Sequence, residues 1–334
     1  MESSKILLPK KTSSSCTPWL WLGTWSMGGE GFGPHDERES LRVLQKAHDN
    51  GLRHFDTAGF YAHGKSEILL QKIIGTVRQE LFISTKGGLI WSGNNVRHSA
   101  SPESLRQQLY ESMERLKTDY IDLYQLHWPD PDVPIATSIA ALKEFKKEGL
   151  ILNWGLGNLT EEELTKHLTP EKNIPHQVHF NPLHNTREVL DAGMNRCISC
   201  IISPLEQGLL GSGISSHGIK GISKKDYRNK NPYYCHKGAI SFSHQLTKLT
   251  DTYDISKTLS ILLWICAQPG VHAVISGARK TGQLEEILRF KSEVLENDYC
   301  SDKQGEGILA PEKVRAAFPE KLWNLLGSYE GLNL

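Results

Sequence analysis

An alternation of short apolar runs with helical stretches constrains the fold of this chain more than any other feature. Between about residue 18 and residue 292, eight apolar runs suit buried strands, and each is followed by a stretch with helical periodicity. The clearest run is YIDLYQLHW at 120–128, which Pro129 ends. Strands that alternate with helices predict an α/β fold with parallel strands joined by helical crossovers. Eight such units fit a closed (β/α)8 barrel (a TIM barrel) better than an open doubly wound sheet.

The expected elements follow one another without a linker-like segment, so a single domain is predicted over 1–334, with its barrel core at about 18–292 and a C-terminal extension at 293–334. The expected strands are 18–24, 53–57, 81–86, 120–128, 151–157, 176–180, 198–204 and 271–276. The expected helices are 37–50, 64–75, 102–117, 136–148, 161–168, 186–194, 239–253, 256–267 and 281–292, with an extra helix at 311–325. For the first 17 residues the expectation is a small hairpin across one end of the barrel. The loop at about 208–237 is too long for a simple connection, which indicates a functional segment.

Composition argues against several classes of function. The 334 residues include 38 basic and 38 acidic ones, and a net charge of zero gives no general attraction to nucleic acid or to an anionic membrane. No apolar run approaches the roughly 20 residues that a membrane span needs. The N-terminal segment lacks an apolar stretch followed by a cleavage site, so a cytoplasmic protein without a secretion signal is expected.

The cysteines point the same way. Six of them are spread along the chain, which is typical of reduced thiols rather than of a disulfide framework. Cys197 and Cys200 form a CxxC inside a probable core strand, and no second pair completes a zinc site. Buried, inert thiols are therefore favoured over a redox or metal role, and no metal is expected.

Reactive side chains follow three neighbouring strands. Asp56 ends the second strand, Lys86 the third and His127 the fourth, while Tyr61 lies in the loop after the second strand. In a barrel these positions share one face. A lysine beside a tyrosine lowers the pKa of the phenol and makes it a better acid, an aspartate keeps the lysine charged, and a histidine donates to a carbonyl oxygen. A single lysine at a strand end is usually a solvated surface charge, and a single histidine in an apolar strand is usually a core residue. The coincidence of all four side chains at adjacent strand ends favours a catalytic site instead.

Seven segments resemble motifs of the aldo-keto reductases, in order along the chain. The three central ones are FDTAGFYAHGKSE, LFISTKGG and DYIDLYQLHWPD. The others are GTWSMGG at 23–29, GLGNLT at 155–160, SPLEQGLLGSG at 203–213 and ISGARKTGQLEE at 275–286. The match covers about 18–292 and is most similar to the bacterial, fungal and plant-type branch of the family.

The resemblance implies reduction of an aldehyde or ketone with NADP(H), or the reverse oxidation, with Tyr61 as proton donor supported by Asp56, Lys86 and His127. The implied cofactor contacts are Thr24, Trp25, Asp56, Asn158, Gln177, Phe180, Ser203, Pro204, Leu205, Gln207, Gly208, Leu210, Gly277, Arg279, Lys280, Gln283 and Glu286. Among them, the resemblance implies that Asn158 and Gln177 hold the carboxamide of the nicotinamide and that Phe180 stacks on its ring. The implied substrate lining is Trp25, Phe60, Tyr61, Trp91, His127 and Trp128. Arg279 and Lys280 favour NADPH over NADH, because guanidinium and ammonium groups donate strong hydrogen bonds to a phosphate dianion such as the 2′-phosphate of NADPH.

Four positions depart from the family pattern: Gly157 replaces a serine, Phe180 a tyrosine, Ser276 a proline and Ile287 an asparagine. A lost neutral hydrogen bond costs about 0.5–1.5 kcal/mol, so weaker cofactor binding is expected rather than lost chemistry.

Two other classes of function stay open. Lys86 could form a Schiff base as in an aldolase, and the chain could be an NADPH-binding regulatory subunit like the potassium-channel β subunits of the same family. The expected partner is a small molecule, such as an aldehyde, a ketone or an open-chain sugar. The sequence selects neither the substrate, nor the direction of the reaction, nor an oligomeric state.

Overall fold

A computed structural model describes residues 19–29, 31–33, 35–93, 95–170, 173–211, 226–296 and 308–329. The hairpin expected for the first 17 residues lies outside this part of the chain, as do residues 212–225 of the long loop.

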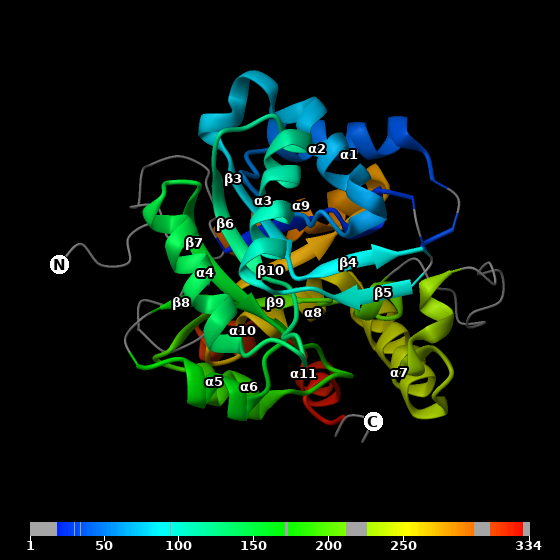
Figure 1. The fold of residues 1–334 in the computed structure, drawn as a ribbon. Coiled ribbons are helices and arrows are strands. Elements are labelled where there is room, and N and C mark those ends of the chain that lie inside the picture. The colour runs from blue at the N-terminus through cyan, green and yellow to red at the C-terminus, as the bar shows by residue number, and fades with distance from the viewer. Residues whose placement is uncertain are drawn as a thin grey trace.

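Parallel strands close into a barrel, which confirms the predicted fold (Figure 1). All eight predicted strands are present, with ends shifted by a few residues. They are β1 (Leu20–Gly23), β2 (His54–Asp56), β3 (Phe82–Gly87), β6 (Ile121–Leu126), β7 (Ile151–Gly157), β8 (Ile174–His179), β9 (Cys197–Ile202) and β10 (Val271–Gly277). Closure is made by β1, which pairs with β2 on one side and with β10 on the other. The carboxyl ends of all eight strands therefore surround one opening.

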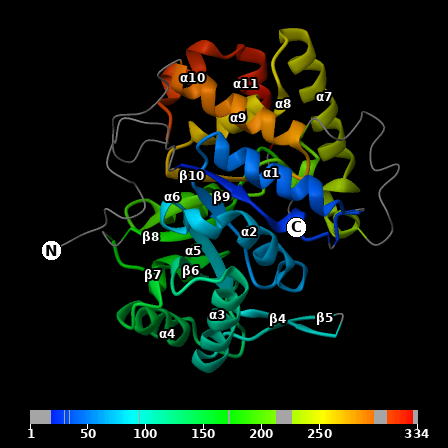
Figure 2. The same cartoon turned by 90° about the horizontal axis from the view of Figure 1, so that it is seen from above.

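Helices cover the outside of the barrel (Figure 2). They are α1 (Glu37–Asp49), α2 (Lys65–Ile74), α3 (Pro102–Leu116), α4 (Ile135–Lys147), α5 (Glu161–His167), α6 (Arg187–Gly193), α7 (Lys237–Tyr253), α8 (Lys257–Cys266) and α9 (Thr281–Glu296). As predicted, Ser101 caps α3, since its hydroxyl accepts from the Ser104 amide and Pro102 takes the first helical position. The apolar side chains between helices and strands form the main core.

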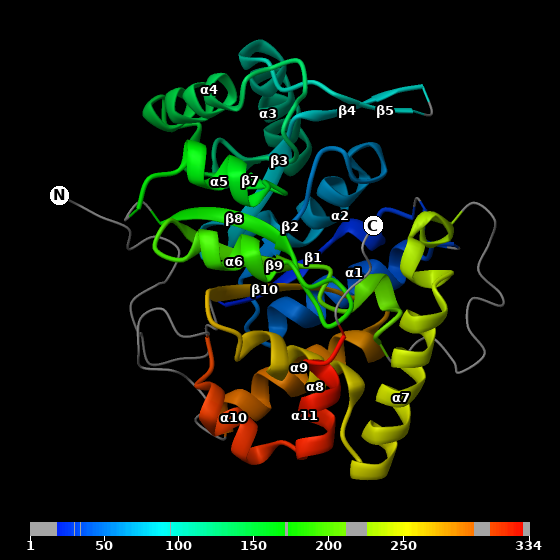
Figure 3. The same cartoon turned by 90° about the horizontal axis from the view of Figure 1, so that it is seen from below.

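The helix predicted at 311–325 is two short helices, α10 (Pro311–Ala317) and α11 (Glu320–Leu326). Phe318 separates them in an extended conformation because it precedes Pro319, and proline disfavours a helical residue before it. Figure 3 shows α10 and α11 beside α8 and α9, and α11 packs on α7 and α8. The single long helix of the prediction is therefore wrong, although its location is right.

A β-hairpin follows β3. It consists of β4 (Leu89–Ser92) and β5 (Asn95–His98), with Trp91 opposite Val96, and it projects from the barrel next to α3 (Figure 2). The sequence predicted only a loop here, because the run is short and lies directly after a strand.

A small cluster of side chains fills the inside of the barrel, and Cys200 belongs to it. Cys197 is also buried, and burial raises the pKa of its thiol to about 12. Burial of both thiols was predicted and is confirmed. The described residues contain no group of His, Cys, Asp and Glu side chains arranged to hold a metal ion, and none of their helices is long and apolar enough to cross a membrane.

Candidate active site

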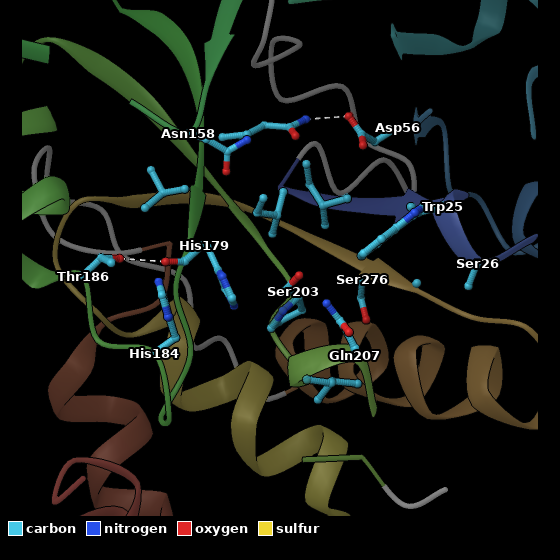
Figure 4. Close-up of a pocket in the computed structure, with 18 of the residues that line it drawn as sticks. Trp25, Ser26, Asp56, Asn158, His179, His184, Thr186, Ser203, Gln207 and Ser276 are labelled. Atoms are coloured by element: carbon cyan, nitrogen blue, oxygen red, sulfur yellow. Dashed lines mark hydrogen bonds between the residues drawn. The ribbon is translucent and has the colours of Figure 1, made fainter. Parts of the chain in front are cut away.

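The carboxyl ends of the barrel strands open into a cavity of about 990 Å³ (Figure 4). Figure 4 shows that its walls come from widely separated parts of the chain, with Trp25 and Asp56 at one side, Asn158 near the top, and His179 and His184 at the other side. A cavity of this size at the carboxyl ends of barrel strands is the usual place for a ligand.

The structure brings together the four side chains predicted to be catalytic. The buried Lys86 ammonium donates to Asp56 Oδ1 at 2.6 Å and to the Thr57 carbonyl at 2.8 Å. Its third contact is the Tyr61 hydroxyl, at 3.3 Å. The His127 ring lies edge-on to Tyr61, with 5.7 Å between ring centroids. Asp56, Tyr61 and His127 all line the cavity.

The protonation states follow from burial and from neighbouring charge. Burial alone would lower the pKa of Lys86, but Asp56 and Tyr61 raise it above its ordinary value, so the amine stays an ammonium. Burial raises the pKa of the Tyr61 phenol, and the opposing effect of Lys86 is smaller. The predicted lowering of this pKa is therefore wrong in its net direction. Burial, together with the Lys86 charge, holds the pKa of His127 well below its ordinary value, so the ring is neutral near pH 7.

The Asp56 carboxylate organises the floor of the cavity. Its Oδ2 accepts from the Ser84 hydroxyl at 2.9 Å and from the Gln177 amide at 2.6 Å. Asn158, which has a left-handed backbone (φ 59°), donates from Nδ2 to the His127 carbonyl at 2.9 Å. These hydrogen bonds fix the amide groups of Gln177 and Asn158, the pair predicted to hold a carboxamide, beside Asp56 and His127.

The loop after β9 forms another wall through an uncommon backbone path. Ser203, Glu206 and Gln207 all have positive φ values of 44–53°. The fully buried Glu206 carboxylate accepts from His179, Asn181 and Asn231, at 2.6–2.8 Å. Burial would raise the pKa of Glu206, but these hydrogen bonds lower it below the ordinary value. The carboxylate thus fixes the loop and ties it to the segment that follows residue 226.

Two polar atoms of this wall have no hydrogen-bond partner among the described residues. They are Gln207 Oε1 and Ser276 Oγ, both buried and both on residues that line the cavity. Buried polar atoms normally have partners. The pair therefore fits a polar ligand in this part of the cavity.

Two basic side chains line the cavity near Phe32. Arg279 lines it and donates to the Phe32 carbonyl. Arg228, which the sequence did not predict, also lines it and pairs with Asp226 at 2.7 Å. Burial and the neighbouring Arg228 charge lower the pKa of Arg279, as expected where two guanidinium groups share a site. The only hint in the sequence was a basic residue inside a long loop.

The remaining predicted cofactor residues divide into two groups. The cavity is lined as predicted by Trp25, Ser203, Pro204, Leu205, Gly208, Gly277, Gln283 and Glu286. Three others do not line it. Thr24 is fully buried and donates to the Asp56 carbonyl, Leu210 lies in the core, and Lys280 is exposed at the surface.

Phe180 also lies away from the cavity, against the prediction that it stacks on a cofactor ring. It is 1% exposed and stacks on Trp264 of α8, with 5.7 Å between ring centroids. Successive residues of an extended segment point to opposite faces. Gln177 and His179 take the inner face, so Phe180 falls on the outer one. His179 and Ile202 line the cavity, whereas Phe180 does not.

Of the predicted substrate-lining residues, Trp25, Phe60, Tyr61, His127 and Trp128 line the cavity, and Leu89 joins them. Trp91 does not. It stacks on the outer side of Phe60, with ring centroids 4.6 Å apart and planes 7° from parallel. Trp91 therefore supports the lining rather than belonging to it.

Comparison with known proteins agrees with this architecture. The family model described as "Aldo/keto reductase family" matches residues 20–302. The aldo-keto reductase YhdN of Bacillus subtilis (strain 168) is 33% identical over 314 residues, which cover 87% of this chain and 94% of the relative. The NADH-specific methylglyoxal reductase of Escherichia coli (strain K12) is 28% identical, covering 84% of this chain and 91% of that protein. The solved glycerol dehydrogenase AKR11B4 from Gluconobacter oxydans superposes with a TM-score of 0.69 at 25% identity, covering 83% of this chain and 90% of that one.

Proposed function

Because the chain belongs to the aldo/keto reductase family, we propose that it reduces an aldehyde or ketone with NADPH and that Tyr61 is the general acid. One observation carries the proposal: the Tyr61 hydroxyl lies in the cavity within hydrogen-bond distance of a buried ammonium group. The bound nicotinamide supplies the hydride that the protein itself lacks. The same arrangement serves the reverse reaction, the oxidation of an alcohol.

The proton that completes the reduction comes from the Tyr61 hydroxyl and passes to the substrate oxygen. Burial raises the pKa of this phenol, so Tyr61 holds its proton at neutral pH. The phenolate that remains is stabilised by Lys86, whose Nζ lies 3.3 Å away, and Asp56 keeps that lysine charged. Neutral His127 still carries one ring N–H, which donates to the same substrate oxygen and stabilises the negative charge that develops on it.

The residues of the cavity fit a nicotinamide dinucleotide. Asn158 and Gln177 would hold the carboxamide through their side-chain oxygens. The unpartnered Gln207 and Ser276 atoms would meet the ribose and pyrophosphate part. Arg279 and Arg228 favour a cofactor with an additional phosphate, since guanidinium groups bind phosphate through charge-assisted hydrogen bonds. NADPH is proposed on this ground, with Arg228 replacing the exposed Lys280 as the second cation.

The reacting end of the cavity supports a small carbonyl substrate with an apolar part. Trp25, Phe60 and Trp128 surround it with aromatic surface, and Leu89 adds an aliphatic side chain. Methylglyoxal and glycerol, which appear in the names of two similar proteins, are of this small size. A reducing compartment such as the cytoplasm is proposed because Cys197, Cys200 and Cys266 are free, buried thiols.

The test is turnover of a carbonyl panel, containing methylglyoxal, aromatic aldehydes and aldoses, followed by NADPH absorbance. Tyr61→Phe is expected to lower kcat by roughly 10²–10⁴-fold, the usual contribution of a general acid. Its dissociation constant for NADPH should stay unchanged, because Lys86 keeps its contacts with Asp56 and Thr57. Tyr110→Phe is the matched control, since Tyr110 is 46% exposed on α3, away from the cavity.

Three other outcomes would contradict the proposal. Wild-type turnover in Tyr61→Phe would remove Tyr61 as the acid. Tight NADPH binding by the wild-type protein without turnover of any carbonyl would favour the regulatory alternative. Borohydride trapping of a substrate on Lys86 would favour the Schiff-base alternative.

A further inference from the structure

The turn that presents Tyr61 has an uncommon backbone conformation. It runs through the short 3₁₀ segment Tyr61–Gly64, in which Ala62 (φ 49°), His63 (φ 54°) and Gly64 (φ 83°) are all left-handed. Side chains disfavour this region, and two adjacent non-glycine residues persist in it only where the surroundings hold them. The contacts that hold this turn therefore control where the Tyr61 hydroxyl lies.

One face of the turn is held by Trp91, from hairpin β4–β5. Its indole is stacked on Phe60, with ring centroids 4.6 Å apart, and on His63, with centroids 4.4 Å apart. Its Nε1 also donates to the Phe60 carbonyl at 2.9 Å. Phe60 directly precedes Tyr61 and His63 follows it by two residues. A single side chain thus contacts the chain on both sides of the proposed acid.

A second set of contacts with the turn comes from Arg115 of α3. A Cβ atom at Gly59 would lie 2.6 Å from Arg115 Nη2, and one at Gly64 would lie 2.5 Å from its Cδ. Arg115 Nε donates to the fully buried Glu67 carboxylate at 2.6 Å, and Thr85, the residue before Lys86, donates to the same carboxylate at 2.6 Å. Arg115 and Glu67 thus tie the turn to α3 and β3, while Trp91 ties it to hairpin β4–β5.

We propose that Trp91 is a positioning residue for the general acid, and that this side chain of hairpin β4–β5 sets the rate of proton transfer without itself touching the substrate. The inference rests on the proposed role of Tyr61. The sequence assigned Trp91 to the substrate lining, but Phe60 stands between Trp91 and the cavity. The two roles differ in what they do to kcat and KM, so they can be separated.

The experiment compares Trp91→Leu, which removes the stack and the hydrogen bond, with Trp91→Phe, which keeps an aromatic ring but loses the bond to the Phe60 carbonyl. Each is assayed with a small and a large carbonyl, methylglyoxal and benzaldehyde, and its NADPH affinity is measured separately. A misplacement of about 1 Å costs on the order of 10²-fold in rate. Trp91→Leu is therefore expected to lower kcat roughly 10- to 100-fold by the same factor for both carbonyls, with KM and NADPH affinity unchanged. Trp91→Phe should be intermediate.

Two comparison variants make the result specific. Val96→Ala alters the residue opposite Trp91 in the hairpin, where Val96 is 50% exposed, and should leave kcat unchanged. Trp128→Leu removes a tryptophan that does line the cavity, and should change KM more for benzaldehyde than for methylglyoxal.

Hydrogen exchange of the 61–64 amides gives a readout that does not depend on turnover. Trp91→Leu should accelerate their exchange while Val96→Ala does not. The proposal is overturned if Trp91→Leu raises KM selectively for benzaldehyde with kcat retained, or if the exchange of these amides is unchanged. Should Trp91→Leu fail to fold, unchanged kcat and exchange in folded Trp91→Phe would overturn it. Absence of turnover in the wild-type protein would count against the proposed function instead, and the exchange data would still decide the role of Trp91 in holding the turn.

Discussion

Replacing Asp56 by asparagine keeps the shape of the side chain but removes the carboxylate that faces Lys86. Asp56 Oδ1 accepts from the Lys86 ammonium at 2.6 Å, and Oδ2 accepts from Ser84 at 2.9 Å and Gln177 at 2.6 Å. An amide offers one oxygen and one NH₂ group. In Asp56→Asn the NH₂ group must therefore face either Lys86 or the pair formed by Ser84 and Gln177, so donor meets donor on one side.

The larger effect is the unpaired charge. The Lys86 side chain is 1% exposed and that of Asp56 is 4% exposed. Removing one partner of a buried ion pair costs about 3–5 kcal/mol because the other charge is left without compensation. The free energy of unfolding of Asp56→Asn should fall by this amount at pH 7.

The loss should also depend on pH. In the wild-type protein, burial lowers the pKa of Lys86, but Asp56 and Tyr61 raise it more, and the stabilisation that results is lost only as pH rises through that raised pKa. Without Asp56 the effect of burial prevails, and the pKa of Lys86 falls below the value of about 10.4 expected in the unfolded chain. The unfolded variant then binds more protons than the folded one, so its stability rises with pH up to about 10.4. The difference in free energy of unfolding between the wild-type protein and Asp56→Asn should therefore become smaller from pH 7 to pH 10.

Urea unfolding at several pH values measures both effects. Ser84→Ala is the control: it removes an uncharged donor to the same carboxylate and should cost about 1.5–3 kcal/mol without this pH dependence. The double variant Asp56→Asn/Lys86→Met removes the buried charge and should be more stable than Asp56→Asn alone. A loss below about 1 kcal/mol in Asp56→Asn, or a double variant no more stable than the single one, would refute the argument from the buried charge.

Two further substitutions test the walls of the cavity. Arg228→Ala should weaken NADPH binding roughly 10- to 100-fold, because a hydrogen bond to a charged group is lost, and it should leave NADH binding nearly unchanged. Isothermal titration calorimetry measures both affinities, and Lys280→Ala is the control at an exposed lysine. Glu206→Gln should lower the melting temperature at pH 7, because the carboxylate accepts three buried hydrogen bonds. The hydrogen bonds hold the pKa of Glu206 below its ordinary value, so its stabilisation is complete above about pH 4.3 and is lost as pH falls through the lowered pKa. The difference in melting temperature between the wild-type protein and Glu206→Gln should accordingly become smaller as the pH falls below about 4.3.

The barrel and the meeting of the proposed catalytic side chains were predictable because both depend on local patterns. Short apolar runs separated by helical stretches predict parallel strands, and this prediction does not depend on which side chains pack against the outside of the strands. Once the strands are placed, Asp56, Lys86 and His127 must share one opening, because each ends a neighbouring strand. No knowledge of side-chain packing is needed for either step.

Side-chain direction was less predictable, since it depends on contacts between distant segments. Phe180 lies on the outer face that the strand alternation gives it, and there its ring stacks on Trp264, 84 positions later in the chain; the sequence alone did not show which face was the inner one. Trp91 lies behind Phe60 because a hairpin forms where a loop was expected. The pKa of Tyr61 rises because burial, which no sequence pattern states, outweighs the charge of Lys86.

Gly157 shows that a departure from a family pattern can have a structural reason rather than mark a loss. A Cβ atom there would lie 2.8 Å from the His127 carbonyl oxygen and 3.2 Å from that of Leu126. Any side chain at 157 would thus push apart the ends of β6 and β7. The close approach also brings Asn158 Nδ2 within 2.9 Å of the His127 carbonyl. The glycine therefore removes a possible hydrogen bond to a cofactor, but it allows Asn158, a proposed cofactor residue, to bind the backbone of His127, a proposed catalytic residue.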